Sequence, residues 1–131
     1  MARRTPDLRT RVRAALLALE GVEESPSAFR DAPAFWVNGK EIAHLDADDA
    51  LDLRLTRKVI SARRARLKAD PRVTLRRSGG DWVEVRFAAE DDLELVAELA
   101  ALAAAAHRPS SGGPGKPPPT GPALERRRRF H

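Results

Sequence analysis

Apolar side chains recur at the helical period in three segments of the chain. The first segment runs from a capping Thr5 to Gly21, and the last runs from about Asp91 to His107. Between them, residues 56–69 form a shorter and very basic segment. The pattern therefore predicts three amphipathic helices that turn one face toward a common core.

Between these helices the pattern changes to one that is typical of strands. Asn38-Gly39 favours a two-residue hairpin turn, because both residues tolerate the positive φ angles that a type I′ turn requires. The turn sets the register of the hairpin, which pairs Val37 with Lys40, Trp36 with Glu41, Phe35 with Ile42, and Pro33 with His44. This register predicts that His44 shares a face with Phe35 and Ile42.

Three further stretches, ALDLRLT, VTLRR and WVEVRF, alternate strictly between apolar and polar residues. Their apolar residues are predicted to face the core, and the other set faces away: Asp52, Arg54, Thr56, Thr74, Arg76, Trp82, Glu84 and Arg86. The order helix, three strands, helix, two strands, helix predicts an α+β fold. We expect a single two-layer domain with a mostly antiparallel sheet of about five strands and helices on one face.

Charge and composition separate a domain over residues 1–108 from a tail over residues 109–131. The tail is rich in proline, glycine and serine and is expected to be disordered. It holds 5 of the 24 Lys+Arg and 1 of the 19 Asp+Glu, which leaves the domain with 19 basic and 18 acidic residues, a net charge of +1. A nucleic-acid partner is therefore unlikely for the domain, although the basic helix and the RRRR run of the tail leave weak binding as an alternative.

Other classes of protein are disfavoured by what the sequence lacks. There is no cysteine, so disulfide and thiolate chemistry are absent. No apolar run approaches the roughly 18 to 20 residues that a membrane span needs, and we expect a cytoplasmic protein with no membrane partner. No glycine-rich phosphate loop is present, and no cofactor is predicted.

The polar set on the sheet is the main candidate for function. Arg54, Arg57, Arg76 and Arg86 could hold a small anionic ligand, and an indole on a polar face is often used for stacking or for an interface with a protein partner. The full candidate binding set is Arg54, Arg57, Arg76, Trp82, Glu84 and Arg86. Cross-strand charge pairing explains most of the same residues without any ligand.

A second hypothesis is an enzyme that uses His44 as an acid or base with Asp46 or Asp52 as its partner. One histidine with nearby aspartates falls short of the three or four ligands of a typical zinc site, so no metal site is predicted. The predicted register favours the plainer alternative, in which His44 is a partly buried, hydrogen-bonded structural residue.

The start of the basic helix raises a separate question. Arg57 and Lys58 lie in its first turn, where positive charge opposes the helix dipole. Two sources of compensation are open. One is the local acidic run of Asp46, Asp48, Asp49 and Asp52, and the other is an anion bound by arginines and free backbone amides.

The strings EIAHLDADDALDLRLT and RLKADPRVTLRRSGGDWVEVRF, with PAFWVNGKE before them and EDDLELVAELAALAAAAHR after them, resemble the short bacterial members of the luciferase family domain. The resemblance runs from about Leu8 to Arg108. It implies a single compact domain that is largely of unknown function. Longer relatives carry a His-x-His pattern where this chain has His44-Leu45-Asp46, so the resemblance implies no histidine-based site here.

Overall fold

The computed structural model describes residues 7–47, 49–76, 80–113 and 115–129. Its helices and strands follow in the order α1 (Leu8–Leu17), β1 (Glu23–Pro26), β2 (Pro33–Val37), β3 (Lys40–Ala47), β4 (Ala50–Arg54), α2 (Arg57–Ala62), α3 (Arg64–Ala69), β5 (Val73–Leu75), β6 (Trp82–Arg86), the 3₁₀ turn η1 (Glu90–Asp92), α4 (Leu93–His107) and α5 (Gly121–Arg129). The predicted α+β class and the predicted order of elements are confirmed, with β1 and α5 as additions. Thr5, the predicted helix cap, lies outside the described residues, and Asp7 caps α1 by accepting a hydrogen bond from the backbone N–H of Thr10.

All neighbouring strands of the sheet are antiparallel, in the order β1-β2-β3-β4-β6-β5. The sheet has six strands rather than about five. The additional strand is β1, which pairs with β2 at one edge. Its sequence, EESP, has no alternating apolar residues, so the period-two pattern could not reveal it.

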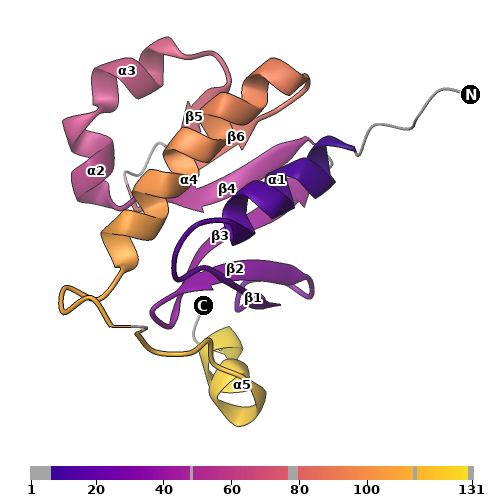
Figure 1. Ribbon diagram of the computed structural model, residues 1–131, viewed down its shortest axis with the longest axis vertical. Coiled ribbons are helices and arrows are strands. Elements are labelled where there is room, and N and C mark those ends of the chain that lie inside the picture. Colours follow the sequence, from indigo (N-terminus) through magenta and orange to yellow (C-terminus); the bar gives the residue numbers. More distant parts are fainter. Residues whose placement is uncertain (1–6, 48, 77–79, 114, 130–131) are drawn as a thin grey trace, which may run out of the picture.

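One face of the sheet carries the main hydrophobic core. Helices α1 and α4 lie side by side across this face (Figure 1). Leu53 and Val83 are fully buried against these helices, and so are Leu51 and Val85, the next pair on this face of β4 and β6. The alternation in these strands therefore directs their apolar side chains as predicted.

Two β-bulges change the register of β3 with its neighbours. At the Asn38-Gly39 turn, φ is 51° and 73°, and Trp36 pairs with Glu41, as predicted. A register shift between Phe35 and Trp36 then makes Phe35 pair with Ala43 instead of Ile42. A second shift, between Leu45 and Ala47, leaves Asp46 as an extra residue in β3. Because one extra residue reverses the facing of those beyond it, the predicted Pro33–His44 pair is wrong.

The predicted middle helix is two short helices. Arg63, with φ of −118° and ψ of 18°, ends α2 and precedes α3. Ile60 and Leu67 anchor the two helices in the main core.

The structure does not confirm the disorder expected for residues 109–131. Helix α5 lies below β1 and β2 in Figure 1, and its Leu124 packs in a small cluster with Ala28, Ala34 and Trp36. Trp36 is paired with Glu41, on the side of the sheet opposite Phe35, so α5 covers part of the face that α1 and α4 leave open.

Candidate functional site

The face opposite α1 and α4 carries a row of polar side chains across four strands. His44 of β3 pairs with Asp52 of β4, Asp52 pairs with Glu84 of β6, and Glu84 pairs with Thr74 of β5. We call this surface the polar face. The predicted placement of His44 beside Phe35 and Ile42 is wrong, because the bulge in β3 turns His44 to the other side of the sheet.

His44 lies between two buried carboxylates. Its Nδ1 is 2.9 Å from Oε2 of Glu41, and its Nε2 is 3.0 Å from Oδ2 of Asp52. His44 is 6% exposed, and both carboxylate residues are more deeply buried. Three ionisable side chains thus form one hydrogen-bonded chain within the sheet.

The two contacts favour the charged form of His44. A neutral imidazole has one N–H donor, so both carboxylates are satisfied only by the imidazolium form. Burial lowers the pKa of His44, but its hydrogen bonds to the carboxylates of Asp52 and Glu41, together with their negative charge, outweigh the effect of burial and raise the pKa above 6.5. The two carboxylate contacts therefore favour the imidazolium form of His44.

Glu41 is a member of this site that the sequence pattern did not predict. Its Oε1 accepts a hydrogen bond from the Ala28 N–H at 2.7 Å, and its Oε2 accepts one from the Ser27 hydroxyl at 2.6 Å. These contacts, together with His44, satisfy a carboxylate that is 2% exposed. The correctly predicted Trp36–Glu41 pair was the available signal, since it places a glutamate beside a large aromatic side chain on the same face.

An aromatic group covers the imidazole. The ring of Trp82 lies 5.2 Å from that of His44, and Phe29 is 5.7 Å from His44 and 5.4 Å from Trp82, between centroids. The guanidinium of Arg54 lies over the Trp82 ring at 5.8 Å. Trp82 is half-buried, and Phe29 is 43% exposed at the edge of the group.

The predicted arginines divide between two places. Arg54 of β4 pairs with Trp82 of β6. Arg76 directly follows Leu75, the last residue of β5, and Leu75 pairs with Val83, the residue after Trp82. Arg54 and Trp82 therefore form one row across β4 and β6, and Arg76, the residue after the end of β5, reaches to 3.7 Å from Asp52.

Arg86 and Arg57 lie away from this row. Arg86 pairs with Ala50, two residues along β4 from Asp52, and its Nε is 3.7 Å from Glu84. Arg57 begins α2 and is exposed there.

Asp81 provides the negative charge at the start of the basic helix. Its Oδ1 accepts a hydrogen bond from the Arg57 N–H at 2.9 Å, and its Oδ2 is 3.8 Å from Arg54. Thr56, with φ of 82°, caps α2 through its hydroxyl, which accepts from the Val59 N–H. The negative charge at the start of α2 thus comes from Asp81, directly before β6, and not from the acidic run at residues 46–52 that was predicted to supply it. Asp48, one of the predicted compensating residues, lies outside the described residues.

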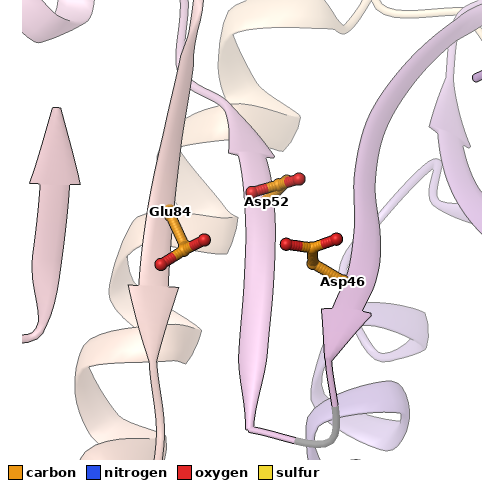
Figure 2. Close-up of side chains that lie close together, drawn as sticks. All are labelled: Asp46, Asp52 and Glu84. Carbon is orange, nitrogen blue, oxygen red and sulfur yellow. The ribbon is translucent and has the colours of Figure 1, made fainter. Parts of the chain in front are cut away.

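Three carboxylates meet beside His44. Figure 2 shows Asp46, Asp52 and Glu84 projecting from β3, β4 and β6 on the same side of the sheet. One oxygen from each lies within 4.8 Å of the others. Asp46 is also bonded to Arg30, with Nη2 to Oδ1 at 2.8 Å, and this interaction lowers the pKa of Asp46. Asp46 lies two residues after His44 in β3, on the same face of the sheet.

Residues 39–103 match the family model described as Luciferase domain. The match begins at the hairpin turn before β3 and extends into α4, so it includes His44, Asp52, Trp82 and Glu84. No curated protein and no solved structure gives a significant match to the chain. Within the residues that the structure describes, no helix combines the length and apolar character that a membrane crossing requires.

Proposed function

We propose, for a chain that belongs to the Luciferase domain family through residues 39–103, that the polar face binds a small anionic ligand. The ligand would lie against Trp82, between Arg54 and Arg76. The observation that carries the proposal is the row of Arg54 and Trp82 on β4 and β6, with Arg76 directly after the end of β5.

The chemistry of the row supports an anion. Guanidinium groups bind carboxylates and phosphates through paired, charge-assisted hydrogen bonds. The side chain of Arg76 is 57% exposed. Its distance of 3.7 Å from Asp52 is longer than a hydrogen bond, so the N–H donors of Arg76 remain available. Arg54 over the Trp82 ring and the exposed Arg76 favour a small anion over the protein partner that the sequence also allowed.

The enzyme hypothesis receives less support from the geometry. Each imidazole nitrogen of His44 is within hydrogen-bonding distance of a carboxylate, and the ring lies beneath Trp82 and Phe29. A general base needs a free nitrogen within reach of its substrate. We therefore assign His44 the role of organising the polar face.

Weak nucleic-acid binding through the tail also receives less support. Arg127 donates from Nη1 to the carbonyl of Gly39 at 2.7 Å, and Arg128 donates from Nε to the carbonyl of Ser27 at 3.1 Å. Two of the four tail arginines are thus engaged with the domain itself.

The proposal can be tested by thermal shift with inorganic phosphate, nucleoside monophosphates and small dicarboxylates. At least one compound should raise the melting temperature of the chain. Arg76→Gln should weaken its binding by about tenfold to hundredfold, as expected for the loss of a charge-assisted contact of about 1.5–3 kcal/mol. Quenching of Trp82 fluorescence would report the same ligand.

Arg64→Gln is the matched control, because it removes the same charge from an exposed position on α3. It should leave the affinity unchanged at fixed ionic strength. The proposal is wrong if no compound in the panel stabilises the chain, or if both variants bind as tightly as the parent.

A further inference from the structure

We infer that Asp46, Asp52 and Glu84 form a binding site for a hard divalent cation such as Mg²⁺ or Ca²⁺. The sequence predicts no metal site, because it offers only His44 with nearby aspartates. The structure adds Glu84 from β6 and replaces the histidine with an all-carboxylate set. The site adjoins the anion site, since Arg76 lies 3.7 Å from Asp52, but its three ligands are carboxylates that take no part in holding the anion.

The spacing of the oxygens matches the coordination sphere of such an ion. Mg²⁺ and Ca²⁺ lie about 2.0–2.6 Å from oxygen ligands, so two ligands on the same ion are at most about 4–5 Å apart. The oxygens of Asp46, Asp52 and Glu84 lie within 4.8 Å of one another. Three carboxylates from adjacent strands leave the remaining positions for water, which both ions retain readily. Mg²⁺ and Ca²⁺ also prefer carboxylate oxygen as a ligand, whereas softer metals prefer sulfur or imidazole nitrogen.

Asp52 supplies the independent evidence for a ligand. Its side chain is 5% exposed. Oδ2 is bonded to His44, whereas Oδ1 is buried and has no hydrogen-bond partner among the residues that the structure describes. Buried carboxylate oxygens are normally satisfied, since an unmade hydrogen bond leaves the cost of desolvation uncompensated. A cation held between Asp52, Asp46 and Glu84 would satisfy this atom.

The residues around the three carboxylates also fit the inference. His44 fixes the Asp52 carboxylate through Oδ2, in the way that outer hydrogen bonds orient metal ligands. Arg30 bonds to Oδ1 of Asp46, which leaves the second oxygen of that carboxylate. Arg76 and Arg86 stand 3.7 Å from Asp52 and Glu84 on side chains that are 57% and 65% exposed, so both can move aside.

The test is to titrate the EDTA-treated full chain with Mg²⁺, Ca²⁺ and Mn²⁺, following the melting temperature and the electron paramagnetic resonance signal of free Mn²⁺. We expect a rise in melting temperature at millimolar Mg²⁺ or Ca²⁺ and loss of the free Mn²⁺ signal with a stoichiometry of one. Glu84→Gln and Asp46→Asn should each weaken binding by at least tenfold. Both side chains are partly exposed, so in EDTA both variants should melt close to the parent chain.

Two controls separate this site from other effects. Asp91→Asn removes an exposed carboxylate from η1 and should bind the cation like the parent chain. Arg76→Gln should retain cation binding even if it loses the anionic ligand, so failure of one proposal is distinguishable from failure of the other. The inference is overturned if the parent chain shows no Mn²⁺ binding, or if Glu84→Gln and Asp46→Asn bind as tightly as Asp91→Asn.

Discussion

At the scale of single residues, the main feature is a chain of buried polar groups. Ser27, Glu41, His44 and Asp52 are the polar or charged side chains among the buried residues that the structure describes. They are joined by hydrogen bonds of 2.6, 2.9 and 3.0 Å. Buried ionisable groups are tolerated when they are paired and hydrogen-bonded, and here His44 lies within hydrogen-bonding distance of both Glu41 and Asp52. This series of hydrogen bonds fixes the side chains on which both proposed sites depend.

Removing one charge from this series of buried polar groups should destabilise the fold. Glu41→Gln keeps the size of the side chain but leaves the His44 imidazolium with one anion instead of two. We expect the free energy of unfolding to fall by about 3 kcal/mol, the lower end of the cost of breaking a buried ion pair. Urea denaturation at neutral pH would measure it. Glu20→Gln, at an exposed position, should change the value by less than about 0.5 kcal/mol, and equal effects of the two substitutions would refute the argument.

At the scale of elements, the sequence predicted what depends on local chemistry. The Asn38-Gly39 turn follows from positive φ angles that those two residues tolerate, and the facing of Leu53 and Asp52 follows from strict alternation within β4. These features need no knowledge of the rest of the fold.

The candidate site could be predicted only in part, because it depends on irregularities. A β-bulge adds one residue to a strand and is determined by packing and twist, so no alternation pattern reveals the two bulges of β3. The first brings His44 to the same face as Glu41. Asp81 was missed for a similar reason, since its contact with Arg57 joins residues 24 positions apart.

The junction before α4 is an element boundary whose stability should depend on pH. Oδ2 of Asp92 accepts hydrogen bonds from the Ala88 and Ala89 N–H groups at 2.8 and 3.0 Å, and Oδ1 accepts one from Arg72 at 3.0 Å. The hydrogen bond from Ala88, followed by that from Arg72, lowers the pKa of Asp92 below 3.8. Asp92 therefore stabilises the fold above the pKa of the unfolded chain, and the contribution is lost as the pH falls through the lower pKa of the folded state.

Asp92→Asn should accordingly lower the free energy of unfolding by about 1 kcal/mol near neutral pH, comparable to the loss of a helix cap. The difference from the parent chain should narrow as the pH falls below 3.8. Urea denaturation across this range would measure both effects. Asp91→Asn, the neighbouring exposed carboxylate, should show neither effect, and a difference that is constant with pH would contradict the assignment to Asp92.

At the scale of the whole molecule, the end of the described chain returns to the hairpin. The Lys116 N–H donates to Oδ1 of Asn38 at 2.9 Å, and Arg127 lies 5.7 Å from the ring of Trp36. Arg128 bonds to the carbonyl of Ser27, whose hydroxyl supports Glu41. Helix α5 thus packs on the segment that supports the buried polar chain, and the proline- and glycine-rich composition before it gave no sign of this contact.

The docking of α5 should depend on Leu124. A helix of 9 residues is too short to be stable alone in water, so it forms because its leucine packs against Trp36 and two alanines. Leu124→Ala should weaken docking by about 2 kcal/mol, the lower end of the cost of such a truncation in a core. Since 1.4 kcal/mol is a factor of ten, trypsin should cleave after Arg126 to Arg129 about 30-fold faster when cleavage follows undocking. Glu125→Gln, on a side chain that is 62% exposed, should leave the rate nearly unchanged. If trypsin cleaves the parent chain and Leu124→Ala at the same rate, α5 is not held by this contact, and the link between the tail and the polar face through Ser27 is lost with it.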